Sequence, residues 1–174
     1  MVLTLSLIKS ARRAKKEFEL YEPMQYWLKN YLNDRYRGAH VITIDAHART
    51  LDSFLEENGI IDQYPQTVGL DIQIDVLGLV SRKGKTDIVF IEAKKTQLNL
   101  HDLGQLWAYC KLCKPLEAFL LSSAGIGSLN KVLNHLSRQD LLEMGEDRCI
   151  RKMRVGKWDI SKNALDFATI IPKF

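Results

Sequence analysis

The chain has 174 residues, of which 46% are hydrophobic and 26% are charged, a composition typical of a globular protein with a sizeable core. Its 25 Lys and Arg exceed its 21 Asp and Glu, and the net charge of +4 suits an anionic partner without demanding one. No run of 18 apolar residues is present, which excludes a membrane-spanning helix. The length and the absence of a linker-like segment predict a single domain over residues 1–174.

The first ten residues, MVLTLSLIKS, are apolar but lack the leading basic region and the small-residue cleavage site of a signal peptide. We expect a first strand or an ordered arm there. The three cysteines, Cys110, Cys113 and Cys149, do not suggest a disulfide framework and favour a reducing, cytoplasmic compartment. Cys110 and Cys113 lie on one face of an expected helix, where we interpret them as small core residues and not as a zinc or redox pair.

Helical and strand-like segments follow one another along the chain. The expected helices, which have apolar residues three and four apart, cover residues 20–36, 51–59, 100–112 and 127–144. Pro23 fits the first turn of the first helix, whose main part is expected to begin near Glu22. Gly59 is expected to end the second helix.

The expected strands are short runs with alternating or continuous apolar residues, over residues 40–47, 67–80, 87–95 and 118–123. Residues 149–160 and 165–172 are expected to form a terminal β-hairpin. The turn RKGK, residues 82–85, should join the second and third strands as another hairpin. This order predicts an α/β fold with a mixed central β-sheet flanked by α-helices.

Charged residues stand where the strand IVFIEAKK ends. Glu92 and Lys94 are two residues apart and therefore project from one face, whereas Ala93 turns to the other. In the preceding strand, Asp71 and Asp75 share one face, and the hairpin would bring Asp75 close to Glu92. Two carboxylates on adjacent strands form an oxygen site for Mg²⁺ or Mn²⁺, to which the Ala93 carbonyl could add a third ligand.

Lys94 beside these acids has two interpretations. It could neutralise them in an ordinary salt bridge, which is the commoner situation for an acid–lysine pair at a strand end. It could instead orient and help deprotonate a water molecule that attacks phosphorus. The charge pattern alone leaves both open.

The segments IDVLGLV, IEAKK and GQLWAY together resemble the PD-(D/E)xK nuclease superfamily, over about residues 17 to 123. The resemblance places Asp75 at the first acid of the family motif, Glu92 at the second and Lys94 at its lysine. Gln105 and Tyr109 match a QxxxY signature that many members carry on the next helix, and they would support the site or contact the substrate. The chain has Leu-Asp-Ile-Gln-Ile before the first acid in place of a literal Pro-Asp. The resemblance implies a restriction-endonuclease-like fold.

Members of this superfamily often place a further glutamate on the first helix, and two residues compete for that position. Glu17 falls at the centre of the helical stripe that contains Tyr21, whereas Glu22 falls about 140° away at ~100° per residue. Pro23 weakens this comparison because it could interrupt the helix. The sequence favours Glu17 and leaves Glu22 as the alternative.

A nuclease needs cations that bind phosphate, and the chain has a basic stretch near its C-terminal end. Arg151, Lys152 and Arg154 lie in it and could give sequence-independent affinity for a DNA backbone, although a solvated basic face explains them equally well. A second basic cluster lies within residues 9–16. No zinc finger, helix-turn-helix or RNA-recognition motif is present, so no sequence-specific reading of bases is expected.

The leading expectation is therefore an Mg²⁺- or Mn²⁺-dependent deoxyribonuclease that hydrolyses phosphodiester bonds, with Asp75, Glu92, Lys94 and Glu17 as catalytic residues. No Walker A, G-x-S-x-G or Cys/His arrangement offers a competing chemistry. The alternatives are a non-catalytic nucleic-acid-binding protein on the same fold and an interaction domain with surface salt bridges. A homodimer would suit an enzyme that cuts both strands of DNA.

Overall fold

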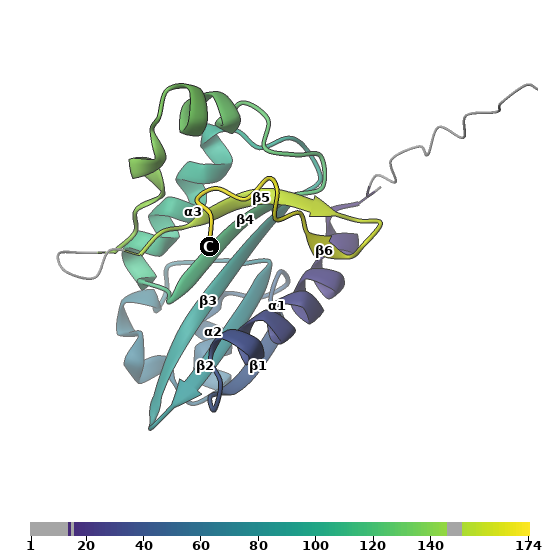
Figure 1. Ribbon diagram of the computed structural model, residues 1–174. Coiled ribbons are helices and arrows are strands. Elements are labelled where there is room, and N and C mark those ends of the chain that lie inside the picture. Colours follow the sequence, from purple (N-terminus) through teal and green to yellow (C-terminus); the bar gives the residue numbers. More distant parts are fainter. Residues whose placement is uncertain (1–13, 15, 146–150) are drawn as a thin grey trace, which may run out of the picture.

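The computed structural model describes residues 14, 16–145 and 151–174, and within these residues six strands form one mixed sheet in the order β1-β2-β3-β4-β5-β6 (Figure 1). The strands are β1 (His40–Asp45), β2 (Val76–Arg82), β3 (Lys85–Lys94), β4 (Glu117–Ser122), β5 (Arg154–Asp159) and β6 (Ala164–Leu165). The first three pair antiparallel, β3, β4 and β5 run parallel, and β6 returns antiparallel to β5. The expected α/β architecture with a mixed sheet is confirmed. The expected N-terminal strand or arm, and Cys149, lie outside the described residues.

The β2–β3 hairpin is formed where the RKGK turn predicts it. Strand β2 ends at Arg82 and β3 begins at Lys85, which leaves Lys83 and Gly84 as a two-residue turn. Both turn residues have positive φ, 48° and 79°, which is the requirement of a type I′ turn. This turn sets the register that pairs Val76 with Ile91 at the far end of the hairpin.

Helices cover both faces of the sheet. Helix α1 (Tyr21–Arg35) covers one face, and α2 (Leu51–Glu57) and α3 (Leu100–Cys113) cover the other. A short 3-10 helix, η1 (Glu17–Leu20), leads directly into α1, and Pro23 lies in the first turn of α1 as expected. The Asn99 side chain caps α3, and the Asn99 N–H in return donates a hydrogen bond to the Asp102 carboxylate. No helix among the described residues is long and apolar enough to cross a membrane.

Helix α1 lies very close to the sheet, and Gly78 in β2 makes this approach possible. A Cβ atom at residue 78 would stand 2.9 Å from Leu32 Cδ1 and 3.2 Å from Leu28 Cδ2. Both leucines are completely buried, so they have little room to move aside. The contact holds α1, and with it the start of the helix, in a fixed position relative to β2.

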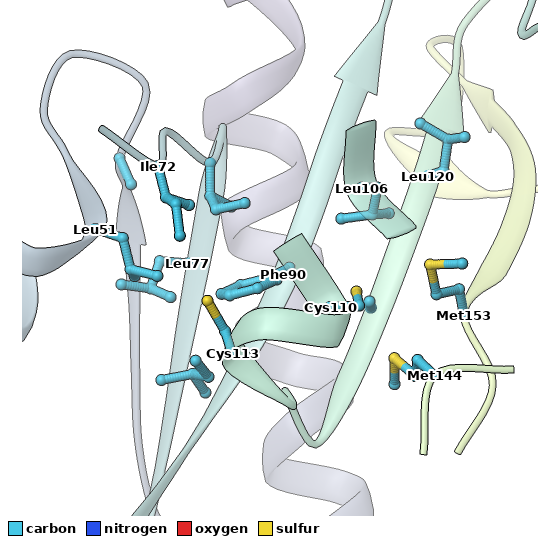
Figure 2. Packing of buried hydrophobic residues seen from close by; sticks show 14 of the residues in the cluster. Leu51, Ile72, Leu77, Phe90, Leu106, Cys110, Cys113, Leu120, Met144 and Met153 are labelled. Atoms are coloured by element: carbon cyan, nitrogen blue, oxygen red, sulfur yellow. The ribbon is translucent and has the colours of Figure 1, made fainter. Parts of the chain in front are cut away.

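Two apolar cores lie on the two faces of the sheet. One contains side chains from α1 and from β2 to β5, and the other contains side chains from α2, α3 and the opposite faces of the strands. Figure 2 shows Cys110 and Cys113 packed in the second core near Phe90. Burial raises the pKa of both thiols, to about 12 for Cys113. The interpretation of these two cysteines as core residues is confirmed.

The expected strand over residues 67–80 is wrong in its first half. Residues 65–67 form a 3-10 helix, and Gly69 and Asp71 both have positive φ, which breaks the extended backbone of a strand. Asp71 and Asp75 are therefore not two residues of one strand. The alternation of apolar and polar residues resembles that of a strand because Ile72 and Ile74 are buried and residue 73 is exposed. This segment nevertheless precedes Val76, the first residue of β2 that pairs with β3.

Two other predictions are only partly correct. Residues 127–144 do not form one helix: a π-helix, η4 (Lys131–His135), and a 3-10 helix, η5 (Gln139–Leu142), are separated by Ser137, whose φ is 53°. The terminal hairpin exists, but β6 has two residues, and Ile171 instead forms an isolated bridge with Val155. Helices 20–36, 51–59 and 100–112 and strands 40–47, 87–95 and 118–123 are confirmed within a few residues at their ends.

Candidate active site

Asp75 and Glu92 face each other at the ends of β2 and β3. The register pairs Val76 with Ile91, so one step further along the hairpin Asp75 lies opposite Glu92. Side chains opposite each other on an antiparallel pair share one face, and Cβ atoms are then about 5 Å apart. Burial raises the pKa of each carboxyl, and the charge of Asp75 adds to the rise at Glu92. The structure thus brings the two expected metal ligands together.

Two hydrogen-bond donors hold the Asp75 carboxylate. The backbone N–H of Ala93 donates to Asp75 Oδ2 at 2.8 Å. The hydroxyl of Tyr21, in the first turn of α1, donates a second hydrogen bond. These bonds lower the pKa of Asp75, but burial has the larger effect and the pKa is raised overall. Asp75 therefore has a fixed orientation in an environment that disfavours its charge.

Glu92 is the most buried acid of the site, with 4% of its surface exposed. Lys94 Nζ donates to Glu92 Oε1 at 2.9 Å, and the Lys94 side chain is itself only 17% exposed. Burial and the facing Asp75 nevertheless raise the pKa of Glu92 to about 7, because Lys94 compensates only part of both effects. The single charge of Lys94 does not balance the buried Glu92 together with the partly buried Asp75.

Lys94 is held in its charged form by its neighbours. Burial alone would lower its pKa, but Glu92, Glu17 and Asp75 outweigh burial and raise the pKa above its ordinary value. A lysine with a raised pKa cannot accept a proton near neutral pH. In this arrangement Lys94 supplies a fixed positive charge and hydrogen-bond donors. The salt bridge to Glu92 is present, and a protonated Lys94 could orient a water molecule but could not take a proton from it.

The structure separates the two candidate N-terminal glutamates. Glu17, in η1, accepts a hydrogen bond at Oε2 from the backbone N–H of Lys95 at 3.1 Å, and its charge acts on Asp75, Glu92 and Lys94. Glu22 is exposed, and its charge is not among the main causes of the pKa shifts of these three groups. Of the two, Glu17 is the one that lies beside the site.

The donor groups present suit a small oxygen-binding cation. The N–H of Ala93 points to Asp75, and because N–H and C=O of one strand residue point the same way, the Ala93 carbonyl faces that side too. Two carboxylates and a carbonyl match Mg²⁺, which usually keeps several waters and takes one or two carboxylates from a protein. Among the described residues, no group of three or more His, Cys, Asp or Glu is placed to hold a metal. The Glu17 carboxylate meanwhile binds the backbone of Lys95.

Gln105 and Tyr109 lie one helical turn apart on α3, and both are partly buried. Tyr109 packs against the core on the α3 face of the sheet. Among the described residues, neither side chain has a hydrogen bond to Asp75, Glu92 or Lys94. The expected supporting role of these two residues stays a prediction.

A pocket of about 570 Å³ opens at Lys95, the residue that directly follows Lys94. It lies where the parallel strands β3, β4 and β5 end, and its lining includes Lys95, Thr96, Ser123 and Lys157. Ser122 Oγ donates to the Thr96 carbonyl at 2.5 Å and ties the ends of β3 and β4 together. The lining also includes Asp159, so its charge is mixed. Two lysines and hydroxyl groups at the carboxyl ends of parallel strands nevertheless offer donors to an anionic substrate.

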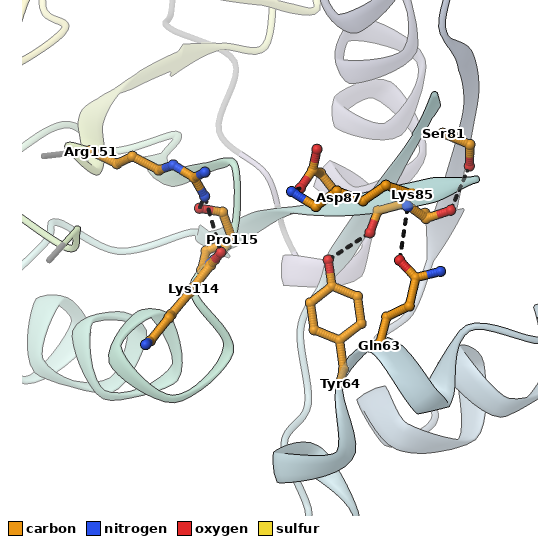
Figure 3. Close-up of polar contacts among 9 residues, drawn as sticks. Gln63, Tyr64, Ser81, Lys85, Asp87, Lys114, Pro115 and Arg151 are labelled. Atoms are coloured by element: carbon orange, nitrogen blue, oxygen red, sulfur yellow. Dashed lines mark hydrogen bonds and ion pairs between the residues drawn. The ribbon is translucent and has the colours of Figure 1, made fainter. Parts of the chain in front are cut away.

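The three residues expected to bind DNA lie elsewhere. Figure 3 shows Arg151 extended towards the carbonyls of Lys114 and Pro115, to which it donates at 3.2 and 3.1 Å. Lys152 pairs with Glu143, with Nζ and Oε1 3.6 Å apart. Arg154 begins β5, whose other end contributes to the pocket beside the carboxylates. These cations therefore do not surround Asp75 and Glu92.

The sequence did not single out Tyr21 or His47. Tyr21 was counted only as one apolar position of a helical stripe, but its hydroxyl binds Asp75 and its ring lies 4.9 Å from that of His47. The His47 Nδ1 in turn lies 2.5 Å from Asp45 Oδ1, at the end of β1. A tyrosine four residues after Glu17, in an otherwise apolar stripe, was the available signal.

Comparisons with protein-family models, with curated proteins and with solved structures found no match to this chain. The residues of the site and their geometry are therefore what can indicate a function.

Proposed function

We propose that this protein is a metal-dependent nuclease that hydrolyses phosphodiester bonds in DNA. One observation carries the proposal: the partly buried Asp75 and the buried Glu92 face each other, and among the described residues Lys94 is the counter-charge in contact with them. Buried like charges are costly unless a cation accompanies them. The likeness of these residues to the PD-(D/E)xK motif, and a mixed sheet flanked by helices, support the same conclusion.

Each residue of the site then has a defined task. Asp75, Glu92 and the Ala93 carbonyl would hold Mg²⁺, which when bound lowers the pKa of a coordinated water and offsets charge on the phosphate. Tyr21 and the Ala93 N–H keep the Asp75 carboxylate in place. Lys94, protonated beside Glu92, presents a positive charge to the reacting phosphate.

Glu17 and the adjoining pocket complete the proposed site. Glu17 accepts a hydrogen bond from the backbone N–H of Lys95 and thereby fixes the backbone directly after Lys94. The scissile strand would lie along the pocket beside Lys95 and Lys157, which would bind its phosphates without reading bases. This arrangement predicts cleavage without strong sequence specificity.

The decisive experiment is a cleavage panel with Mg²⁺ or Mn²⁺ on plasmid, single-stranded and branched DNA and on RNA. We expect Glu92→Gln and Lys94→Met to lower the rate about 10³-fold or more, because each removes a group that acts on the reacting centre. Glu17→Gln should lower the rate less, and the matched variant Glu22→Gln should cut like the wild-type protein. Cleavage of no substrate by the wild type, or equal rates in Glu92→Gln and the wild type, would contradict the proposal.

The alternative, a non-catalytic nucleic-acid-binding protein, makes a different prediction for the same panel. It requires DNA binding by the wild type and by Glu92→Gln alike, without cleavage by either. A metal titration followed by thermal unfolding separates the cases further, since a ligand that binds only the folded state stabilises it. We expect Mg²⁺ to raise the Tm of the wild type and not that of Glu92→Gln.

A further inference from the structure

A second pocket, of about 440 Å³, lies beside the C-terminal end of α1 and the start of β4 and β5. Its lining includes the end of α1 at Arg35 and Tyr36 and the buried Glu117. Tyr21 stands at the start of α1 beside the carboxylate site, and Arg35 follows 14 residues later, about 21 Å along the helix axis at 1.5 Å per residue. The pocket is therefore distinct from the candidate active site.

The charge around this pocket is strongly unbalanced. Among the described residues, the lining has one acidic side chain, that of Glu117, and five basic ones: Arg35, Arg151, Lys152, Arg154 and Lys173. Arg151 and Lys173 are anchored by backbone carbonyls, so no carboxylate is part of those contacts. Lys152 pairs only loosely with Glu143, at 3.6 Å and with both side chains about 40% exposed. An excess of positive charge thus converges on one concave surface.

The one acid among the described lining residues already has partners inside the protein. Glu117 accepts hydrogen bonds from Tyr31 at 2.7 Å, from Tyr36 and from Arg154 at 3.0 Å, and it forms an ion pair with Arg35 at 2.9 Å. Three donors and a second arginine occupy most of the acceptor positions of a carboxylate. Two arginines therefore share a single negative charge, and the buried Nε of Arg154 has no hydrogen-bond partner among the described residues.

We propose that this pocket binds a phosphate-bearing ligand. Guanidinium groups match phosphate oxygens in a bidentate geometry, and an excess of four positive charges suits a multiply charged anion better than a single carboxylate. The volume lies within the range of about 300–1,000 Å³ for small-ligand sites, which leaves room for more than one phosphate group. This proposal does not depend on the proposed nuclease activity.

Calorimetric titration with inorganic pyrophosphate, in EDTA and at constant ionic strength, tests the site directly. We expect Lys152→Glu to weaken binding about tenfold or more, because it replaces a charge-assisted hydrogen-bond donor to the anion with a like charge. Lys131→Glu is the matched control: Lys131 is exposed on η4, outside this pocket, and the same charge reversal there should change the affinity less than about twofold by screening. Asp75→Asn should bind pyrophosphate like the wild type, which keeps this test separate from the nuclease proposal.

No binding of pyrophosphate by the wild type at millimolar concentration, or equal weakening by Lys152→Glu and Lys131→Glu, would overturn the proposal. If circular dichroism shows that Lys152→Glu is unfolded, Arg151→Gln takes its place, with the exposed Arg138→Gln as its control. Competition then identifies the source of the phosphate. Displacement by a 5′-phosphorylated oligonucleotide but not by its unphosphorylated form indicates a nucleic acid end, and displacement by a nucleoside triphosphate alone indicates a free nucleotide.

Discussion

Two buried glutamates in the same sheet show opposite ways of placing a carboxylate in a protein. Glu92 in β3 and Glu117 in β4 are each 4% exposed, and the register places them three positions apart along paired strands. Glu117 accepts hydrogen bonds from two tyrosines and from Arg154, and it forms an ion pair with Arg35. Glu92 has one lysine and faces Asp75, another acid. The charge of Glu117 is balanced by groups of the protein. The charge of Glu92 is balanced only in part, and a bound cation would balance the rest.

The largest expected effect is on stability, and it has opposite signs at the two glutamates. Glu117→Gln removes the counter-charge of Arg35 and Arg154, and we expect it to lower the free energy of unfolding by about 3 kcal/mol, the scale for breaking a largely buried ion pair. Glu92→Gln removes a repulsive charge and should leave the metal-free protein as stable or more stable at pH 8. Urea denaturation of both variants measures the difference, and destabilisation of equal size in both would remove the distinction between the two sites.

The pH dependence of stability tests the raised pKa of Glu92. Its ordinary value is 4.5 and its folded value is about 7, so between these pH values the folded state binds a proton that the unfolded state does not. The stability that this proton contributes is complete below about pH 4.5 and is lost as the pH rises through 7, by up to about 3 kcal/mol. We expect the metal-free wild type to lose stability over this window.

The variant Glu92→Gln is the control for this pH dependence. It should show a smaller loss over the same window, so that the difference between variant and wild type grows from pH 5 to pH 8. Denaturation curves in EDTA at several pH values measure it. Parallel pH profiles for the two proteins would mean that Glu92 titrates normally and that the contrast with Glu117 is not electrostatic.

The smallest expected effect concerns Tyr21, which binds Asp75 as Tyr31 binds Glu117. Tyr21→Phe removes a donor to a carboxylate that keeps the Ala93 N–H, so we expect a loss of about 1 kcal/mol of stability. If Tyr21 positions Asp75, the variant should also need a higher Mg²⁺ concentration for half-maximal stabilisation. Tyr31→Phe is the matched control, because it should change stability without changing the Mg²⁺ requirement. An unchanged Mg²⁺ requirement in Tyr21→Phe would limit Tyr21 to a packing role.

Much of the fold could be predicted because its elements have local signals. Apolar spacing identified α1 and α3, and the RKGK turn located the β2–β3 hairpin. The hairpin then placed Asp75 opposite Glu92, since the register of a two-residue turn follows from its geometry. The strand prediction failed at residues 71–75, where apolar residues alternate but the backbone does not pair with β3. The helix prediction over residues 127–144 failed at Ser137, whose positive φ breaks an otherwise helical pattern.

The strand ends, and the meeting of two acids and a lysine there, could be predicted from the chain alone because they depend on contacts within one hairpin. Three other contacts became known only from the folded arrangement: Glu17 and not Glu22 lies beside the site, Tyr21 binds Asp75, and Arg154 donates to Glu117. Those contacts join elements far apart in the chain, and they depend on how closely α1 packs on β2 and how β5 pairs with β4. Packing of this kind has no local periodicity, so it cannot be predicted from one segment alone.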